Sequence, residues 1–63
     1  MPISGKNAIK KLRKSGWEVV SQNGSHVKLR KDGVTTIVPV HGNHDLPRGT
    51  LKSIEKQTGE KLT

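Results

Sequence analysis

Apolar residues recur at helical spacing near the start of the chain, between Ser4 and Gly16. On a helix, Ala8, Ile9 and Leu12 would form one narrow apolar stripe, and most of the remaining positions are basic. Ser4 is a favourable N-cap, and Gly16 can adopt the left-handed conformation that often ends a helix. The pattern therefore predicts an N-terminal helix with a basic outer surface.

Trp17 follows this helix and is the only Trp, Tyr or Phe of the chain. At the end of a helix that closes with a Schellman motif, residue 17 would contact Leu12. We therefore predict that Trp17 belongs to the core. The alternative is that its ring stacks on a nucleobase, as aromatic side chains do in many RNA-binding proteins.

After the first helix, apolar and polar side chains alternate, which predicts short strands. Asn23-Gly24 and Asp32-Gly33 favour two-residue hairpin turns, and we expect positive φ angles at both Asn23 and Gly24. Two tight turns in succession would make an antiparallel meander. Pro39 lacks an amide hydrogen, so it should lie near a strand end or at a sheet edge. The predicted strands are residues 17–22, 25–31 and 34–40, with Trp17 and Val19 on one face of the first.

A second helix is predicted for residues 47–58. Pro47 suits the first helical position, and Leu51 and Ile54 are the strong apolar pair at helical spacing. Gly49 would lie inside this helix at a cost of about 1 kcal/mol relative to alanine. We expect that the sheet, or a phosphate at backbone level, needs the space that a side chain would fill.

The order helix, three strands, helix predicts an α+β fold in a single domain of residues 1–63. Each helix has one thin apolar stripe, so both helices should pack on the same face of a three-stranded antiparallel sheet. The other face of the sheet would then be exposed to water. This α-β-β-β-α order is shared by the double-stranded-RNA-binding fold.

Twelve Lys and Arg residues against five Asp and Glu give a formal charge of +7, which favours a polyanion or an acidic protein as partner. The chain has no cysteine, which excludes disulfides and thiolate metal sites and fits a reducing compartment. The longest apolar run, residues 37–40, is far shorter than the ~20 residues of a membrane span. The N-terminal residues have no apolar region typical of a signal peptide. We expect a cytoplasmic protein that does not bind a membrane.

The predicted second strand carries the candidate chemistry. Histidine is the only side chain whose unperturbed pKa lets it take and give a proton near neutral pH. His26 would lie between cations on an open strand face, which suits a partner that carries phosphates. The alternative is an ordinary solvated strand face. Alternation would direct Ser25, Val27 and Leu29 to one face, and His26, Lys28 and Arg30 to the other.

Several segments resemble the HicA family of toxins, and the resemblance extends from the first helix to Gly59. The segments are Gly16-Trp17, Gly24-Ser25-His26, Val38-Pro39-Val40-His41 and Leu46-Pro47-Arg48-Gly49-Thr50-Leu51-Lys52-Ser53-Ile54. The resemblance implies a double-stranded-RNA-binding-like fold and the toxin of a type II toxin–antitoxin system. It also implies a metal-independent endoribonuclease that cleaves mRNA and is inhibited by a HicB antitoxin. Glu55 and Thr58 depart from the family pattern, so the second helix should hold the sheet less tightly.

The resemblance maps the catalytic histidine of the family onto His26. Metal-independent RNA cleavage needs a proton acceptor near the 2′-hydroxyl, a proton donor near the departing 5′-oxygen, and positive charge near the phosphate. Lys28 and Arg30 would supply that charge, and Ser25 and Gly24 would contact RNA beside them. No second proton-transferring residue stands out, and no cofactor is expected. The oligomeric state is open, a homo-oligomer included.

Two alternatives remain beside this interpretation. His41 and His44 lie next to Asp45 at a spacing that could bind a metal, but no fourth ligand is nearby, so a loop role is favoured. The whole chain could also be a non-catalytic RNA-binding module, because both functions need the same basic charge.

Overall fold

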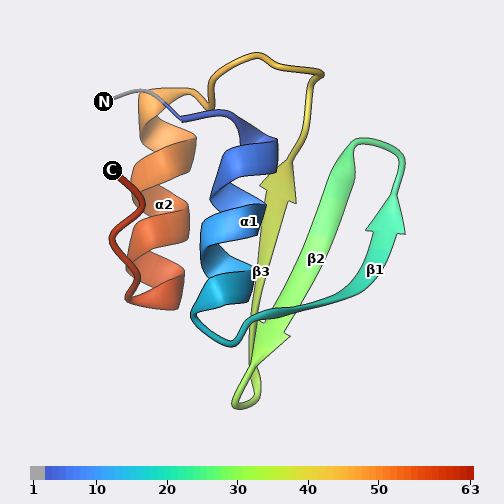
Figure 1. Cartoon of the computed structure of the whole chain (residues 1–63), viewed down its shortest axis with the longest axis vertical. Helices are drawn as coiled ribbons and strands as arrows, with labels where there is room; N and C mark the ends of the chain where they lie inside the picture. The colour runs from blue at the N-terminus through green and yellow to red at the C-terminus, as the bar shows by residue number, and fades with distance from the viewer. Residues whose placement is uncertain (1–2) are drawn as a thin grey trace.

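The computed structural model describes residues 3–63, so the first two residues of the predicted domain lie outside the described residues. The three strands form one antiparallel sheet with β2 in the centre. Figure 1 shows α1 and α2 side by side, with the sheet behind and beside them. The predicted α-β-β-β-α fold is confirmed. Its elements are α1 (Gly5–Lys14), β1 (Glu18–Asn23), β2 (His26–Lys31), β3 (Val34–Pro39) and α2 (Arg48–Thr58).

Both ends of α1 have the predicted caps. The Ser4 hydroxyl accepts a hydrogen bond from the Asn7 amide at 3.2 Å. At the other end, the Trp17 amide donates to the Leu12 carbonyl at 3.0 Å, and the Gly16 amide donates to the next carbonyl at 3.1 Å. This pair of bonds is a Schellman motif. It turns Trp17 into the core, where the side chain is 4% exposed, so the prediction of a core role is confirmed.

The core lies between the two helices and one face of the sheet. Thr36 is its one buried polar residue among those described, and its hydroxyl donates to the Gln57 side chain of α2 at 2.8 Å. That bond satisfies the hydroxyl and ties β3 to α2. The buried apolar residues are Ile3, Ala8, Leu12, Trp17, Val27, Leu29, Val38, Leu46, Leu51, Ile54 and Leu62.

Leu62 was not predicted as a core residue, yet it is only 1% exposed. The chain turns back after Gly59 and lies along the helices (Figure 1). The Leu62 amide donates to the Glu55 carboxylate at 2.7 Å, and its carbonyl accepts from Lys11 Nζ at 3.1 Å. Thr58 helps to begin this segment, because its hydroxyl accepts from the Glu60 amide at 3.1 Å. The two residues that depart from the family pattern therefore hold the C-terminal segment in place.

The turn between β1 and β2 lies one residue later than predicted. Asn23 pairs with His26, so the central residues of the turn are Gly24 and Ser25. Among these residues only Gly24 has a positive φ, of 62°. A hairpin turn with glycine first needs only that one positive angle, so Asn23 stays in the strand and Ser25 belongs to the turn instead of starting β2.

The first strand does not start where the sequence predicts, and it contributes no buried residue to the core. Trp17 precedes β1 instead of opening it, and all six residues of β1 are exposed. Val19 pairs with Leu29 on the side of the helices but remains 44% exposed. The register shifts between Val19 and Ser21, and β1 curves away from the helices, so no helix covers it (Figure 1).

Two predictions about α2 also need correction. The helix starts at Arg48, with Pro47 as the residue before the first helical position. At Gly49, a Cβ atom would meet no heavy atom within 4 Å, so the sheet does not need the space there. Pro39 lies where the sequence predicts, because it is the last residue of β3, an edge strand of the sheet. Val40 was predicted to belong to this strand, but it lies in the loop that follows.

Candidate functional site

The side chains of β2 alternate as the sequence predicts. Val27 is 6% exposed and Leu29 is fully buried against the helices. His26, Lys28 and Arg30 are exposed on the opposite side of the sheet, which we call the open face. Consecutive side chains on one face of a strand are about 7 Å apart, so these three form an evenly spaced row.

Neighbouring strands complete the open face, because residues that pair across antiparallel strands point to the same side. His26 has only uncharged neighbours on β1 and β3. Ile37 is 52% exposed beside Lys28, and it gives this basic surface one apolar position that the sequence analysis did not single out. Its pairing with Lys28 could have been inferred from the hairpin register. The cross-strand pairs are His26 with Asn23 and Pro39, Lys28 with Ser21 and Ile37, and Arg30 with Glu18 and Thr35.

The turn that precedes His26 is fixed by its backbone and open to solvent. The Ser25 carbonyl accepts from the Val40 amide at 2.7 Å, and the Gly24 carbonyl accepts from the Gln22 side chain at 3.1 Å. A Cβ atom on Gly24 would have no heavy atom within 4 Å. The structure thus places the five predicted site residues along one turn and one strand.

Gly5 sets the position of α1 relative to His26, and the sequence analysis missed it. Gly5 is buried, and a Cβ atom there would collide with the Pro39 carbonyl oxygen. Pro39 is the cross-strand partner of His26, so the first turn of α1 lies against the same end of the sheet as the histidine. A glycine at the start of a helix, directly after a good N-cap, was the available signal, since glycine disfavours helices.

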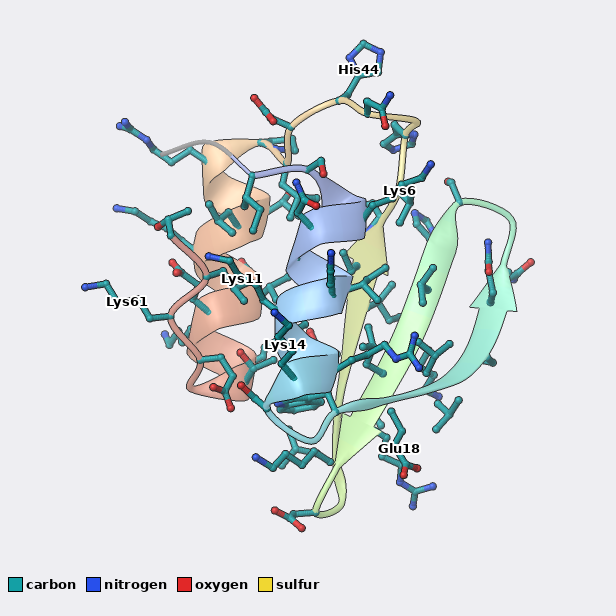
Figure 2. The ribbon with its side chains drawn as sticks, in the orientation of Figure 1. Lys6, Lys11, Lys14, Glu18, His44 and Lys61 are labelled. Atoms are coloured by element: carbon teal, nitrogen blue, oxygen red, sulfur yellow. The ribbon has the colours of Figure 1, made fainter. Side chains whose placement is uncertain are left out.

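His41 and His44 lie outside the strands, in the loop between β3 and α2. Figure 2 shows the His44 ring projecting from the tip of this loop into solvent. The His44 amide donates to the His41 carbonyl at 3.0 Å, which closes a turn. Within residues 3–63, no three His, Cys, Asp or Glu side chains gather closely enough to bind a metal ion.

Comparison with known proteins decides the family. The profile described as HicA toxin of bacterial toxin–antitoxin systems matches residues 5–60, from the first turn of α1 to beyond α2. The chain belongs to the HicA toxin family. A similar HicA protein is a probable mRNA interferase from Pseudomonas fluorescens (strain Pf0-1), 40% identical over 50 residues. That alignment covers 79% of this chain and 83% of the relative.

The HicA match includes the turn and strand that carry His26, Lys28 and Arg30. Neither helix of the described chain is long and apolar enough to cross a membrane. An exposed imidazole can take a proton from, or give one to, a ribose oxygen, and the two cations beside it can balance the charge of a phosphodiester.

Proposed function

We propose that this HicA toxin is a metal-independent endoribonuclease that cleaves mRNA, with His26 as its single proton-transferring residue. The observation that carries the proposal is the row on β2: one exposed histidine, followed on the same face by Lys28 and Arg30. His26 is also the only histidine of the sheet. The name of the Pseudomonas relative, an mRNA interferase, supports the same reaction.

In the proposed reaction, the 2′-hydroxyl of one nucleotide attacks the adjacent phosphorus. His26 takes the proton of that hydroxyl as the new P–O bond forms. The bond to the 5′-oxygen of the next nucleotide breaks, and the imidazolium returns a proton to that oxygen. The products are a 2′,3′-cyclic phosphate and a free 5′-hydroxyl, so no metal-bound water is required.

Lys28 and Arg30 have an electrostatic role in this proposal. Their charges offset the negative charge that grows on the phosphate oxygens in the transition state. The open Gly24 turn lets an RNA backbone approach without a steric barrier, and the Ser25 hydroxyl can hydrogen-bond to a phosphate or ribose beside His26.

We further propose that a HicB-type antitoxin inhibits the enzyme by covering the open face. The chain has a formal charge of +7, and an acidic partner would associate with it quickly through electrostatic attraction. The partner would occupy the surface that RNA needs. Membership of a toxin–antitoxin family supports such a partner.

Cleavage of RNA that is methylated at its 2′-hydroxyls tests the mechanism. Methylation removes the attacking group, so we expect purified protein to cut unmodified RNA and leave the methylated RNA intact. Cleavage should persist in excess EDTA. Undiminished cleavage of methylated RNA would rule out the mechanism, and zinc-reversible loss in EDTA would point to a metal. RNA binding without any cleavage would instead indicate a non-catalytic module.

A further inference from the structure

The outer surface of α1 carries four exposed cations that the proposed reaction does not use. Lys6, Lys10 and Lys14 are spaced four residues apart, and Arg13 lies beside Lys14 and three residues after Lys10. Residues at these spacings lie on one side of a helix. We call these four residues the α1 stripe. Figure 2 shows Lys6 near one end of α1 and Lys14 near the other.

The α1 stripe is electrostatically unfavourable for the helix itself. Like charges four residues apart destabilise a helix, and a cation in the first turn, such as Lys6, opposes the helix dipole. The helix has no acidic residue, and the salt bridge found within residues 3–63 joins Lys31 to Glu60 and includes no residue of the stripe. Because none of these four cations forms a salt bridge within residues 3–63, the stripe suits an external polyanion.

The α1 stripe starts at the end of the molecule that carries His26. Lys6 follows Gly5, whose backbone lies against Pro39, the cross-strand partner of His26. From Lys6 the stripe extends about 12 Å along the helix to Lys14. Shallow hollows flank it, and both are bordered by Lys10 and Lys14. A flexible polyanion held at His26 could therefore continue over this end of the molecule onto α1.

We propose that the α1 stripe is a second RNA-binding site, which holds the backbone phosphates of the single strand that flanks the cleavage site. This inference rests on the proposed ribonuclease function. The stripe belongs to α1, which packs on the face of the sheet opposite His26, so its proposed role lies outside the proton transfer. It therefore increases affinity for long RNA without taking part in the chemistry.

The composition of the α1 stripe favours RNA over a protein or a membrane. Protein interfaces depend on large apolar or aromatic anchors, and the exposed large apolar residues all lie in strands. Binding in the plane of a membrane needs an exposed apolar helix face, but Ala8 and Leu12 of α1 are fully buried. Phosphate contacts need only accessible cations.

The test compares two triple variants with the same loss of charge. The first, Lys6→Gln/Lys10→Gln/Lys14→Gln, removes most of the α1 stripe. The control, Lys52→Gln/Lys56→Gln/Lys61→Gln, removes three exposed cations from α2 and the C-terminal segment. Glutamine is a good helix former, so both variants should fold, as circular dichroism and thermal unfolding would verify.

Cleavage of long and short RNA separates binding from chemistry. For a single strand of about 30 nucleotides, we expect the stripe variant to lower kcat/KM about tenfold or more, mainly through KM. The control should lower it less than about threefold. For a dinucleotide, whose single phosphate is the one that is cleaved, no flanking phosphate exists to bind the stripe. Both variants should then have a kcat/KM close to that of the wild type.

Equilibrium binding tests the α1 stripe without relying on cleavage. In a His26→Ala background, each phosphate contact to a single strand contributes about 0.7 to the slope of log affinity against log salt concentration. For the long RNA, the stripe variant loses three contacts, so the magnitude of this slope should fall by about 2. The control variant should change it by less than about 1.

Several outcomes would overturn the inference. Equal losses in the two variants would mean that net charge alone matters. An equal loss of kcat/KM on the short RNA in the stripe variant would place the stripe in the catalytic site. A loss of antitoxin affinity with unchanged RNA affinity would make the stripe a protein-docking surface. If the wild-type protein cleaves no RNA, the proposed function fails, but the salt slopes still decide whether the stripe binds RNA.

Discussion

Replacing His26 with alanine should separate stability from catalysis. The side chain is exposed on the open face, so its loss should lower the free energy of unfolding by at most about 1 kcal/mol. Removal of the proposed proton-transferring group should reduce cleavage by ~100-fold or more. RNA binding should be retained better than cleavage, because the cations remain. Chemical denaturation and cleavage of a defined RNA measure the two effects.

Val27→Ala is the matched control, since Val27 is the next residue along β2 and is 6% exposed. It should harm folding first, and activity only to the extent that the protein unfolds. An unfolded His26→Ala protein would contradict the exposed position of the ring. Unchanged cleavage by a folded His26→Ala protein would show that another group is the catalyst.

Gly5→Ala tests a residue whose importance the sequence did not reveal. The added methyl group would collide with the Pro39 carbonyl, so we expect a loss of about 1–3 kcal/mol in the free energy of unfolding. Gly49→Ala is the control, because its methyl group would meet no neighbour within 4 Å. That variant should be unchanged or up to about 1 kcal/mol more stable. Equal stability of the two variants would mean that α1 does not need this close approach.

The role of a residue could be predicted where it follows from a local pattern, but not where it depends on a contact distant in the sequence. The shared face of His26, Lys28 and Arg30 follows from the two-residue period of a strand and needs no knowledge of the rest of the fold. The role of Gly5 arises from its contact with Pro39, and that of Leu62 in part from its bond to Lys11, 51 residues away in the sequence. No local pattern encodes such contacts.

At the scale of elements, the shift of the β1–β2 turn left the faces of β2 unchanged. The predicted turn centre was Asn23-Gly24, and the structure has Gly24-Ser25 there instead. Val27 and Leu29 are nevertheless buried, as predicted. Burial of two alternating apolar side chains fixes which face points inward, because a slip of one residue would expose both. The exposure of β1 was not predictable, since it depends on how far the helices extend across the sheet.

The C-terminal segment should stabilise the whole helical layer. Leu62 is 1% exposed and its backbone bonds to both Glu55 and Lys11, so it fastens α2 to α1. We expect Leu62→Ala to lower the free energy of unfolding by about 2 kcal/mol or more. Thermal or urea unfolding would measure the loss, with exposed Lys61→Ala as the control. A Leu62→Ala protein as stable as the control would mean that the segment is detached in solution.

At the scale of the whole molecule, basic side chains lie on opposite sides. The open face carries Lys28 and Arg30, and the outer side of α1 carries the stripe. Composition gave the total charge of +7 but not this distribution, which depends on both helices packing on one side of the sheet. The distribution lets one partner cover the open face while the other cations stay accessible.

An antitoxin that inhibits by occlusion should make His26 inaccessible. We expect the toxin–antitoxin complex to bind RNA at least tenfold more weakly than the free toxin, as measured by fluorescence anisotropy with His26→Ala toxin to prevent cleavage. Association of the two proteins should slow as salt is added, because opposite charges steer the encounter. Equal RNA affinity of the free toxin and the complex would show that inhibition does not require covering this face.

The position of Trp17 has a practical consequence for all these measurements. The indole is the only Trp, Tyr or Phe side chain of the chain, and it lies in the core, where its Nε1 donates to the Glu60 carboxylate at 3.4 Å. Its fluorescence therefore responds to loss of the core and of the C-terminal segment. RNA bound to the open face would not contact it. Intrinsic emission can thus follow unfolding while a dye on the RNA follows binding, in one sample and without an introduced fluorophore on the protein.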